Sequence, residues 1–139
     1  MDFRSRLQRP RAYNDPGHAH ELTFSCFRKY RFLSRERTCE WLADSIDAAR
    51  EKLQFNLWAF VFMPDHVHLI VHPRTYPYDT SEWIKDVKAP VGREGVAYLK
   101  AEVAAWLPEI QVRKGTKLIH RFWQAGRGHD RNIDNARTL

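Results

Sequence analysis

Alternation of apolar and polar residues is clearest in the middle of the chain, where two apolar runs lie close together. Leu57 to Met63 and Val67 to Val71 are joined through Pro64-Asp65. Apolar runs of this length around a Pro-Asp pair predict two neighbouring strands linked by a tight turn. Glu21 to Phe27 alternates in a similar way and predicts an earlier strand.

Helical spacing follows the first predicted strand. Apolar residues recur at three- and four-residue steps from Cys39 to Leu53, and Ser34 is placed to cap the amino end of this helix. A second helical region opens near Thr80-Ser81. We expect it to be broken in the middle and then to resume as far as Pro108, because it contains Pro90, Gly92 and Gly95.

Two further elements complete the predicted order. Leu118 to Gln124 reads as a fourth strand, and a final helix is expected from near Asn132. Strand, helix, strand, strand, helix, strand is the order of the ferredoxin-like architecture. The sequence therefore predicts an α+β fold in which helices cover one face of an antiparallel sheet.

The 139 residues, of which 43% are hydrophobic, suffice for one globular domain. Residues 1–17 lack periodicity and predict a flexible basic arm, which leaves residues 18–139 as the domain. No apolar run approaches the roughly 18 residues of a membrane helix, and no secretion signal is evident, so we expect a cytoplasmic protein without membrane contact. Cys26 and Cys39 lack a paired spacing and are expected to be reduced packing thiols.

Positive charge is clustered along the chain, with a net charge of +6. Between Gln111 and Arg131 the one acidic residue is Asp130. Cations along a groove, together with aromatic faces, bind single-stranded nucleic acid. We therefore expect nucleic-acid contacts from Arg28, Lys29, Arg31, Arg121, Trp123, Arg127 and Arg131. The pattern fits equally well a Trp123 that is buried in the core.

Two histidines lie at the start of the second central strand. His66 and His68 point to the same face, because side chains in a strand alternate, while Val67 points to the other face. Two neighbouring imidazoles supply half of a typical metal site, and a metal there can stabilise charge that develops during phosphoryl transfer. The spacing alone also fits two polar residues that bond to carbonyl groups or water.

Residues 63–71, Met-Pro-Asp-His-Val-His-Leu-Ile-Val, resemble the HUH signature (histidine, bulky apolar residue, histidine) of single-tyrosine transposases. The resemblance is strongest to the REP-associated tyrosine transposases. Leu22-Thr23-Phe24, Trp83 to Lys88 and Phe122-Trp123-Gln124 also fall in the family's order, so the resemblance covers roughly residues 18–139. It implies binding of single-stranded or hairpin DNA, Mg²⁺ or Mn²⁺ at His66 and His68, and DNA cleavage and rejoining by transesterification, as in transposition.

The nucleophile of that family is one tyrosine on a helix that follows the Phe-Trp-Gln strand. It attacks the phosphate and leaves a 5′-phosphotyrosine and a free 3′-hydroxyl. Arg131 to Leu139 resembles the opening of that helix and contains no tyrosine. The resemblance therefore places the nucleophile beyond Leu139. None of Tyr76, Tyr78 and Tyr98 follows Phe122-Trp123-Gln124, so no catalytic residue is identified, and the sequence leaves open whether this chain is an enzyme.

Two other functions fit the same residues. One is a non-catalytic ferredoxin-like module that binds nucleic acid and keeps a vestigial site. The other is a metal-dependent phosphoesterase that uses bound hydroxide instead of tyrosine. Under any of the three, an incomplete last helix would leave apolar sheet surface exposed, so we expect a homodimer or binding to a partner.

Overall fold

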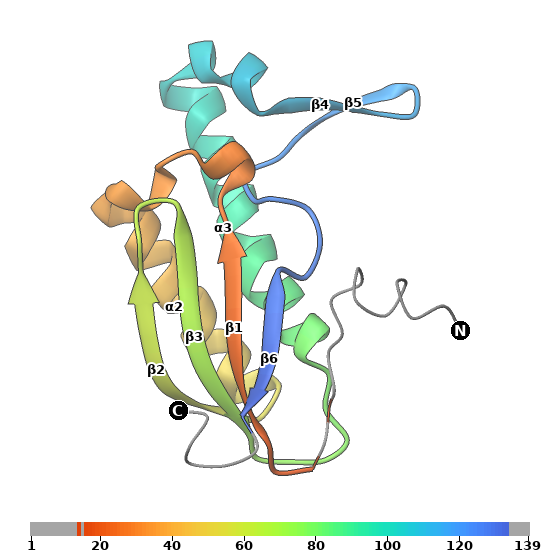
Figure 1. Cartoon of the computed structure of the whole chain (residues 1–139). Coiled ribbons are helices and arrows are strands. Elements are labelled where there is room, and N and C mark those ends of the chain that lie inside the picture. The colour runs from red at the N-terminus through yellow and green to blue at the C-terminus, as the bar shows by residue number, and fades with distance from the viewer. Residues whose placement is uncertain (1–13, 15, 134–139) are drawn as a thin grey trace.

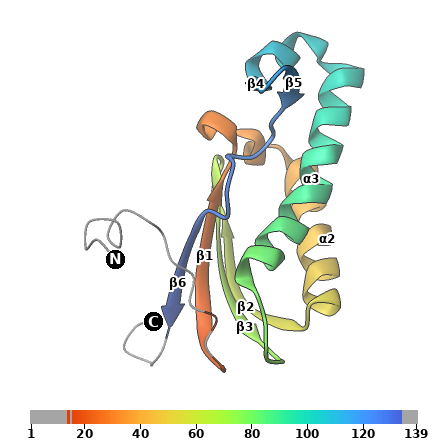
Figure 2. The same cartoon turned by 90° about the vertical axis from the view of Figure 1, so that its right-hand side faces the viewer.

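The computed structural model describes Asn14 and residues 16–133. Four antiparallel strands form one sheet in the order β2-β3-β1-β6, and helices α2 and α3 cover one of its faces (Figures 1 and 2). This is the predicted α+β architecture, with the ferredoxin-like strand order. The bounds are Ala19–Ser25 for β1, Glu36–Lys52 for α2, Phe55–Phe62 for β2, His66–Pro73 for β3, Thr80–Glu102 for α3 and His129–Ile133 for β6.

The core lies between the sheet and the two helices. Burial alternates along β3, where Val67, Leu69 and Val71 are buried and the histidines between them are half-buried. Strand β1 contributes Leu22 and Phe24 to the same core face. Because one face of each strand is apolar, a single layer of helices is enough to bury it. The opposite face of the sheet, which carries the two histidines, has no helix over it among the described residues (Figure 2).

Short elements connect the main ones. Three 3₁₀ segments occur in the described chain, η1 at Phe27–Lys29, η2 at Phe32–Ser34 and η3 at Ala104–Ile110. Strands β4 (Gln111–Lys114) and β5 (Lys117–His120) pair with each other in a separate two-stranded ribbon. The predicted cap at Ser34 is wrong, since Arg35 occupies the cap position of α2 and the Ser34 hydroxyl instead donates to the carbonyl of Arg31 at 2.7 Å.

The predicted break in the second helix is wrong. Helix α3 runs without interruption through Pro90, Gly92 and Gly95. A proline inside a helix removes one hydrogen bond and crowds the preceding turn, at a cost of about 3 kcal/mol. Val87 and Val91, on either side of Pro90, are buried against α2 and the sheet, and their burial favours a continuous helix. The helix ends at Glu102, and the segment as far as Pro108 belongs to η3.

The predicted fourth strand is also placed wrongly. Only the first three residues of that segment, Leu118 to His120, are in a strand, which is β5 of the ribbon. The fourth strand of the main sheet is His129–Ile133, which includes residues assigned to the start of a last helix. Strand β6 pairs with β1 at the sheet edge. The rest of the predicted last helix, and most of the predicted basic arm, lie outside the described residues.

A buried polar network ties the sheet to the start of α3. His20 is fully buried, with its Nδ1 atom 2.7 Å from Asp130 and its Nε2 atom 2.8 Å from the Tyr78 hydroxyl. The other carboxylate oxygen of Asp130 accepts from the Thr80 hydroxyl. This network lies on the helix-covered side of the sheet and gives His20 a hydrogen-bond partner at each ring nitrogen. In the described part of the chain, no helix is long and apolar enough to cross a bilayer.

Candidate metal centre and nucleic-acid interface

The two histidines of β3 face one another on the open side of the sheet. His66 and His68 lie on the same face, and their Nε2 atoms are 3.0 Å apart. The ring centroids are 4.8 Å apart and the rings are nearly perpendicular, at 80°. Strand alternation brings the two side chains together, and the predicted pairing of the imidazoles is therefore present.

Each ring is also held on its other nitrogen. The Nδ1 atom of His66 lies 2.7 Å from the carboxylate of Asp65, and the Nδ1 atom of His68 lies 3.1 Å from the hydroxyl of Thr23 on β1. The hydrogen bond from His66 lowers the pKa of Asp65, and the ammonium group of Lys29 acts in the same direction. An Nδ1–H that donates to Asp65 leaves the Nε2 lone pair of His66 free to accept a proton or to bind a metal.

The spacing of the two Nε2 atoms matches two neighbouring metal ligands. Two ligands at 90° around an ion, each about 2.1 Å from it, are about 3.0 Å apart, whereas tetrahedral ligands are about 3.4 Å apart. The pair therefore fits adjacent positions of an octahedral ion. Within residues 14 and 16–133, no group of three or more His, Cys, Asp or Glu side chains could hold a metal. An ion at this point would have to take its remaining ligands from groups other than His, Cys, Asp or Glu of the described chain.

A shallow apolar depression lies beside His68 on the open face. It has a volume of about 230 Å³, and its lining includes Ala59, Val61 and Ile70. Val61 pairs with His68 across the two strands and is 52% exposed. Further exposed apolar side chains on the edge strand β2 are Trp58 and Phe60, followed by Met63 in the turn. Apolar side chains are therefore exposed along the edge strand beside β3, with Val61 on the face of the imidazoles. The last helix, whose incompleteness is the predicted cause of an exposed apolar sheet surface, lies outside the described residues, and homodimer formation stays a prediction.

The first basic cluster, Arg28, Lys29 and Arg31, lies at the end of the sheet that carries His66 and His68. The segment after β1 wraps around the β2–β3 turn, with backbone hydrogen bonds of 2.9 Å from Cys26 to Asp65 and from Leu33 to Pro64. Arg28 and Lys29 adopt left-handed backbone angles, with φ of 52° and 57°, and both are exposed. Arg31 is exposed in the same segment. These three cations therefore flank the turn that precedes His66.

The second group of predicted DNA-binding cations, Arg121, Arg127 and Arg131, is more dispersed in the structure. Arg131 lies on β6 and pairs with Glu21 of β1, at 2.5 Å between the guanidinium and the carboxylate. Arg121 is half-buried close enough to Lys88 that its charge contributes to the lowered pKa of that lysine, although burial of Lys88 is the larger cause. Arg127 lines a groove between α3 and the loop after Trp123. The structure thus spreads these arginines over the sheet and the helix layer.

Trp123 lies in the core. It is 7% exposed, its ring packs edge-on against Phe24, and its indole N–H donates to the carbonyl of Lys88 at 3.0 Å. Of the two interpretations of the sequence, core packing is the one that the structure supports. A buried ring offers no face on which a base can stack, so Trp123 is not part of the interface that we propose.

The tyrosines of the described chain take part in packing and polar contacts. The Tyr78 hydroxyl bonds to His20 on the helix-covered side. The Tyr98 ring lies under the guanidinium of Arg37, 4.1 Å from its centroid, and Tyr76 is exposed in the loop before α3. We therefore assign no nucleophile to them, in agreement with their positions in the sequence.

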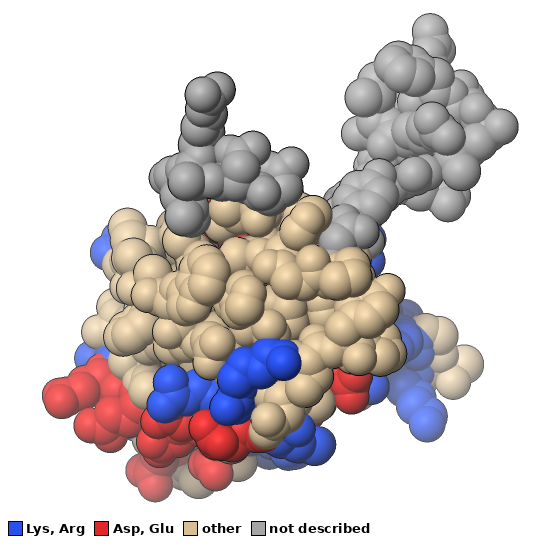
Figure 3. All heavy atoms as spheres, turned by 90° about the horizontal axis from the view of Figure 1, so that it is seen from below, with Lys and Arg blue, Asp and Glu red and all other residues tan. Residues whose placement is uncertain are grey.

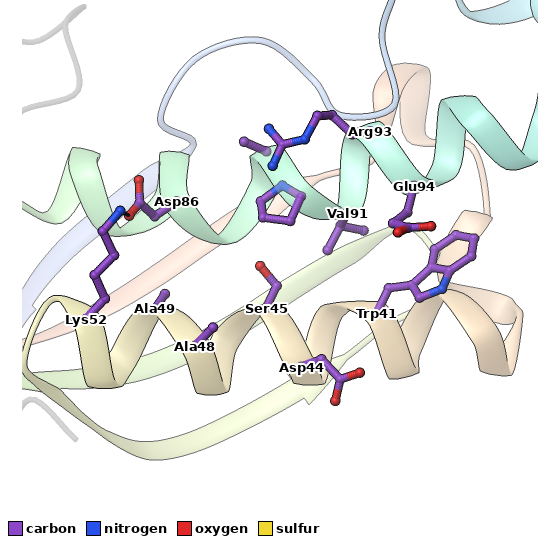
Figure 4. A pocket seen from close by; sticks show the side chains of 12 residues that line it. Trp41, Asp44, Ser45, Ala48, Ala49, Lys52, Asp86, Val91, Arg93 and Glu94 are labelled. Atoms are coloured by element: carbon purple, nitrogen blue, oxygen red, sulfur yellow. Dashed lines mark ion pairs between the residues drawn. The ribbon is translucent and has the colours of Figure 1, made fainter.

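A larger groove lies between α2 and α3, away from the imidazole pair (Figure 4). Its volume is about 510 Å³, and small side chains such as Ser45, Ala48 and Ala49 line its floor. Lys52 and Asp86 form an ion pair of 3.1 Å at one end. Ser45 donates to the carbonyl of Val87 at 2.6 Å, so this groove is the seam between the two packed helices. It contains none of the predicted site residues.

Sequence reasoning missed the partners behind the imidazoles. Asp65 is adjacent to His66 in the chain, and the same Pro-Asp pair that predicts the turn could have indicated it. Thr23 is 45 residues from His68 in sequence and meets it only because β1 pairs with β3 in this register. No local pattern could have given that contact.

Comparisons with known proteins agree with this architecture at the level of the fold. No family model and no curated protein matches the sequence. The chain is similar to the structure of a REP-associated tyrosine transposase bound to a REP hairpin, with a TM-score of 0.67 and 18% identity over 94% of this chain. It spans 64% of the length of that protein. It is also similar to a presumed transposase from Deinococcus radiodurans R1, with a TM-score of 0.58 and 17% identity over 93% of this chain and 86% of that one. The chain therefore has the fold of these transposases.

Proposed function

We propose that this chain is a transposase-like HUH domain that binds single-stranded or hairpin DNA and a divalent metal ion, Mg²⁺ or Mn²⁺. The proposed reaction is cleavage and rejoining of a DNA strand by transesterification. The observation that carries the proposal is the approach of two Nε2 atoms to 3.0 Å while both Nδ1 atoms are held from behind. The fold shared with a transposase bound to a DNA hairpin adds support.

The residues present have defined parts in this proposal. His66 and His68 would hold the ion through Nε2, and Asp65 and Thr23 would fix the orientation of the two rings. A bound divalent ion supplies Lewis-acid stabilisation of the charge that builds up on a phosphate oxygen. Lys29, with the neighbouring Arg28 and Arg31, would attract DNA phosphates to this end of the sheet. The nucleophilic tyrosine is expected beyond Leu139, because of the resemblance to the single-tyrosine family.

Metal binding is tested by calorimetric titration with Mn²⁺. We expect the wild-type protein to bind the ion and the double variant His66→Ala, His68→Ala to lose binding. His72→Ala is the matched control, because His72 lies on the same face of β3 but stacks on Trp58 at 4.7 Å instead of joining the pair. Unchanged Mn²⁺ binding in the double variant would defeat the assignment.

DNA binding and cleavage separate the three candidate functions. A fluorescent hairpin with a single-stranded flank should bind more tightly with Mn²⁺ than with chelator if the imidazole pair takes part. Binding that is indifferent to chelator, with no cleavage even in a protein extended through the expected tyrosine, would favour a non-catalytic binding module. Metal-dependent nicking without a protein–DNA adduct on a denaturing gel would favour a phosphoesterase. A covalent adduct in the extended protein is the result expected for transesterification.

A further inference from the structure

The β4–β5 ribbon projects from the body at the end of the molecule where β2 turns into β3 (Figure 1). Its root is fixed, since Val112 packs on the apolar cluster of Phe27, Leu99 and Ile110, and the backbone N–H of Arg121 donates to the carbonyl of Ile110 at 2.8 Å. Beyond this root its side chains are exposed. The ribbon contributes little to the core, and the imidazole pair does not use it.

The register of the ribbon places like charges together at its tip. Lys114 lies directly opposite Lys117, and Arg113 lies opposite Leu118, with all four side chains exposed. Like charges directly opposite each other in an antiparallel ladder are destabilising. The ion pairs found in the described chain leave these three cations without a carboxylate partner. The fold therefore holds a repulsive pair that a bound polyanion would relieve.

The two faces of the ribbon also narrow the choice of partner. Paired residues share a face, so Lys114 and Lys117 lie on one side, and Arg113 lies on the other. A flat anionic surface such as a lipid headgroup layer can meet one face at a time. A groove with a phosphate chain along each wall meets both, so cations on two faces favour double-stranded nucleic acid.

We propose that the β4–β5 ribbon enters the major groove of a double-stranded DNA stem, with Lys114 and Lys117 toward one phosphate wall and Arg113 toward the other. Each strand has 4 residues, which gives a length of about 14 Å at about 3.4 Å per residue. A major groove about 12 Å wide and 8.5 Å deep admits a two-stranded ribbon. This inference rests on the DNA-binding part of the proposed function.

The position of the ribbon suits a stem that leads into a single strand. The ribbon and the Arg28–Lys29 segment lie at the same end of the molecule as the turn before His66 (Figure 1). Seen from the opposite end, acidic and basic side chains lie side by side along one margin of the molecule (Figure 3). A stem held by the ribbon would thus be kept at the imidazole end, and its unpaired flank would be close to the open face of the sheet.

The test compares two triple variants on two DNA probes by fluorescence anisotropy over a range of salt concentrations. The ribbon variant carries Arg113→Gln, Lys114→Gln and Lys117→Gln. The control variant removes the same charge from exposed positions of the helix layer and carries Lys52→Gln, Lys85→Gln and Arg93→Gln. One probe is a DNA hairpin with a single-stranded flank, and the other is the flank alone.

We expect the ribbon variant to bind the hairpin roughly 100-fold more weakly near 0.15 M salt, with a salt slope smaller by about 2.7, because about 0.9 is lost for each phosphate contact. Binding of the flank alone should be unchanged, and the control variant should behave as wild type on both probes. The melting temperature of the ribbon variant should not fall, because the repulsive lysine pair has been removed.

Three results would overturn the inference. The first is a hairpin affinity that is the same in the ribbon variant as in the wild type, and the second is a wild-type affinity for the hairpin that is too low to measure. The third is an equal loss of affinity for both probes, which would show general electrostatic attraction and not recognition of the stem. Calorimetry with Mn²⁺ separates this inference from the metal-dependent part of the proposed function. If the wild-type protein binds no Mn²⁺ but the ribbon variant still binds the hairpin more weakly than the wild type, the metal-dependent part of the proposed function is wrong and the role of the ribbon stands.

Discussion

Substitution of Gly95 by alanine tests how α3 is packed onto the segment that carries Phe122 and Trp123. A Cβ atom at Gly95 would lie 2.3 and 2.4 Å from two ring carbons of Phe122. The Phe122 ring is 5% exposed and stacks on Phe32 with 4.6 Å between centroids, so it cannot easily retreat by the ångström or more that normal contact requires. The close approach explains a glycine in the middle of a long helix.

Gly92 provides a matched control on the same helix. A Cβ atom there would lie 3.6 Å from the nearest carbon of Trp123, which is ordinary contact. Both changes gain about 1 kcal/mol of helix propensity, while overpacking at Gly95 costs about 1–3 kcal/mol. The propensity gain cancels in the comparison. Gly95→Ala should therefore be less stable than Gly92→Ala by about 1–3 kcal/mol, and Gly92→Ala should be at least as stable as the wild type.

The assay is urea unfolding of the three proteins, followed by tryptophan fluorescence and by circular dichroism. Equal slopes with urea would show that the midpoints report stability and not a change in the denatured state. A Gly95→Ala protein as stable as Gly92→Ala, with unchanged slope, would refute the close packing of α3 on Phe122. It would also mean that the contact with Phe122 does not require a glycine at position 95.

Three further predictions follow from single contacts. Thr23→Val should weaken Mn²⁺ binding by about 10–100-fold in calorimetry, because it removes the partner that orients His68; unchanged affinity would show that the hydroxyl has no such part. Burial raises the pKa of Cys26 to about 12, so its thiol should resist labelling at pH 8 until the protein unfolds, and rapid labelling of native Cys26 would contradict this. Burial lowers the pKa of Lys88 from 10.5 to about 8. The unfolded chain then holds more protons than the native one between these values, so the free energy of unfolding should rise with pH across that window relative to Lys88→Met, and parallel pH profiles would argue against it.

The strand with the histidines could be predicted because its pattern is local. Alternation puts Val67 and Leu69 on one face and the two histidines on the other, whatever the rest of the chain does. The fourth strand could not be found in this way. Its five residues, His129–Ile133, include only one apolar side chain, Ile133, and pairing with β1 at the sheet edge is what makes them a strand.

The segment predicted as the fourth strand shows the converse case. Leu118 to Gln124 is rich in apolar residues, which suits a buried strand. In the structure Phe122 and Trp123 are indeed buried, but against α3, Phe32 and Phe24 instead of along a ladder, apart from one isolated bridge from Trp123 to Cys26. Periodicity therefore identified which residues are buried and not which surface buries them.

The hydrogen bonds to the two Nδ1 atoms indicate that the orientation of both imidazole rings is fixed for a reason other than packing. Half-buried histidines on an open sheet face could satisfy their nitrogens with water, so packing alone gives no reason to fix both rings. In this sheet Asp65 and Thr23 hold the two Nδ1 atoms and leave the two Nε2 atoms facing each other across 3.0 Å. If both rings carry their proton on Nδ1, two lone pairs meet, and the arrangement is unfavourable until a cation lies between them. If the Thr23 hydroxyl instead donates to Nδ1 of His68, the Nε2–H of His68 can donate to Nε2 of His66, and the two rings are hydrogen-bonded to each other without an ion. A change of the His68 tautomer, in which the proton leaves Nδ1 and one is taken up at Nε2 while the Thr23 hydroxyl turns from acceptor to donor, thus allows the same ring geometry to exist with and without an ion.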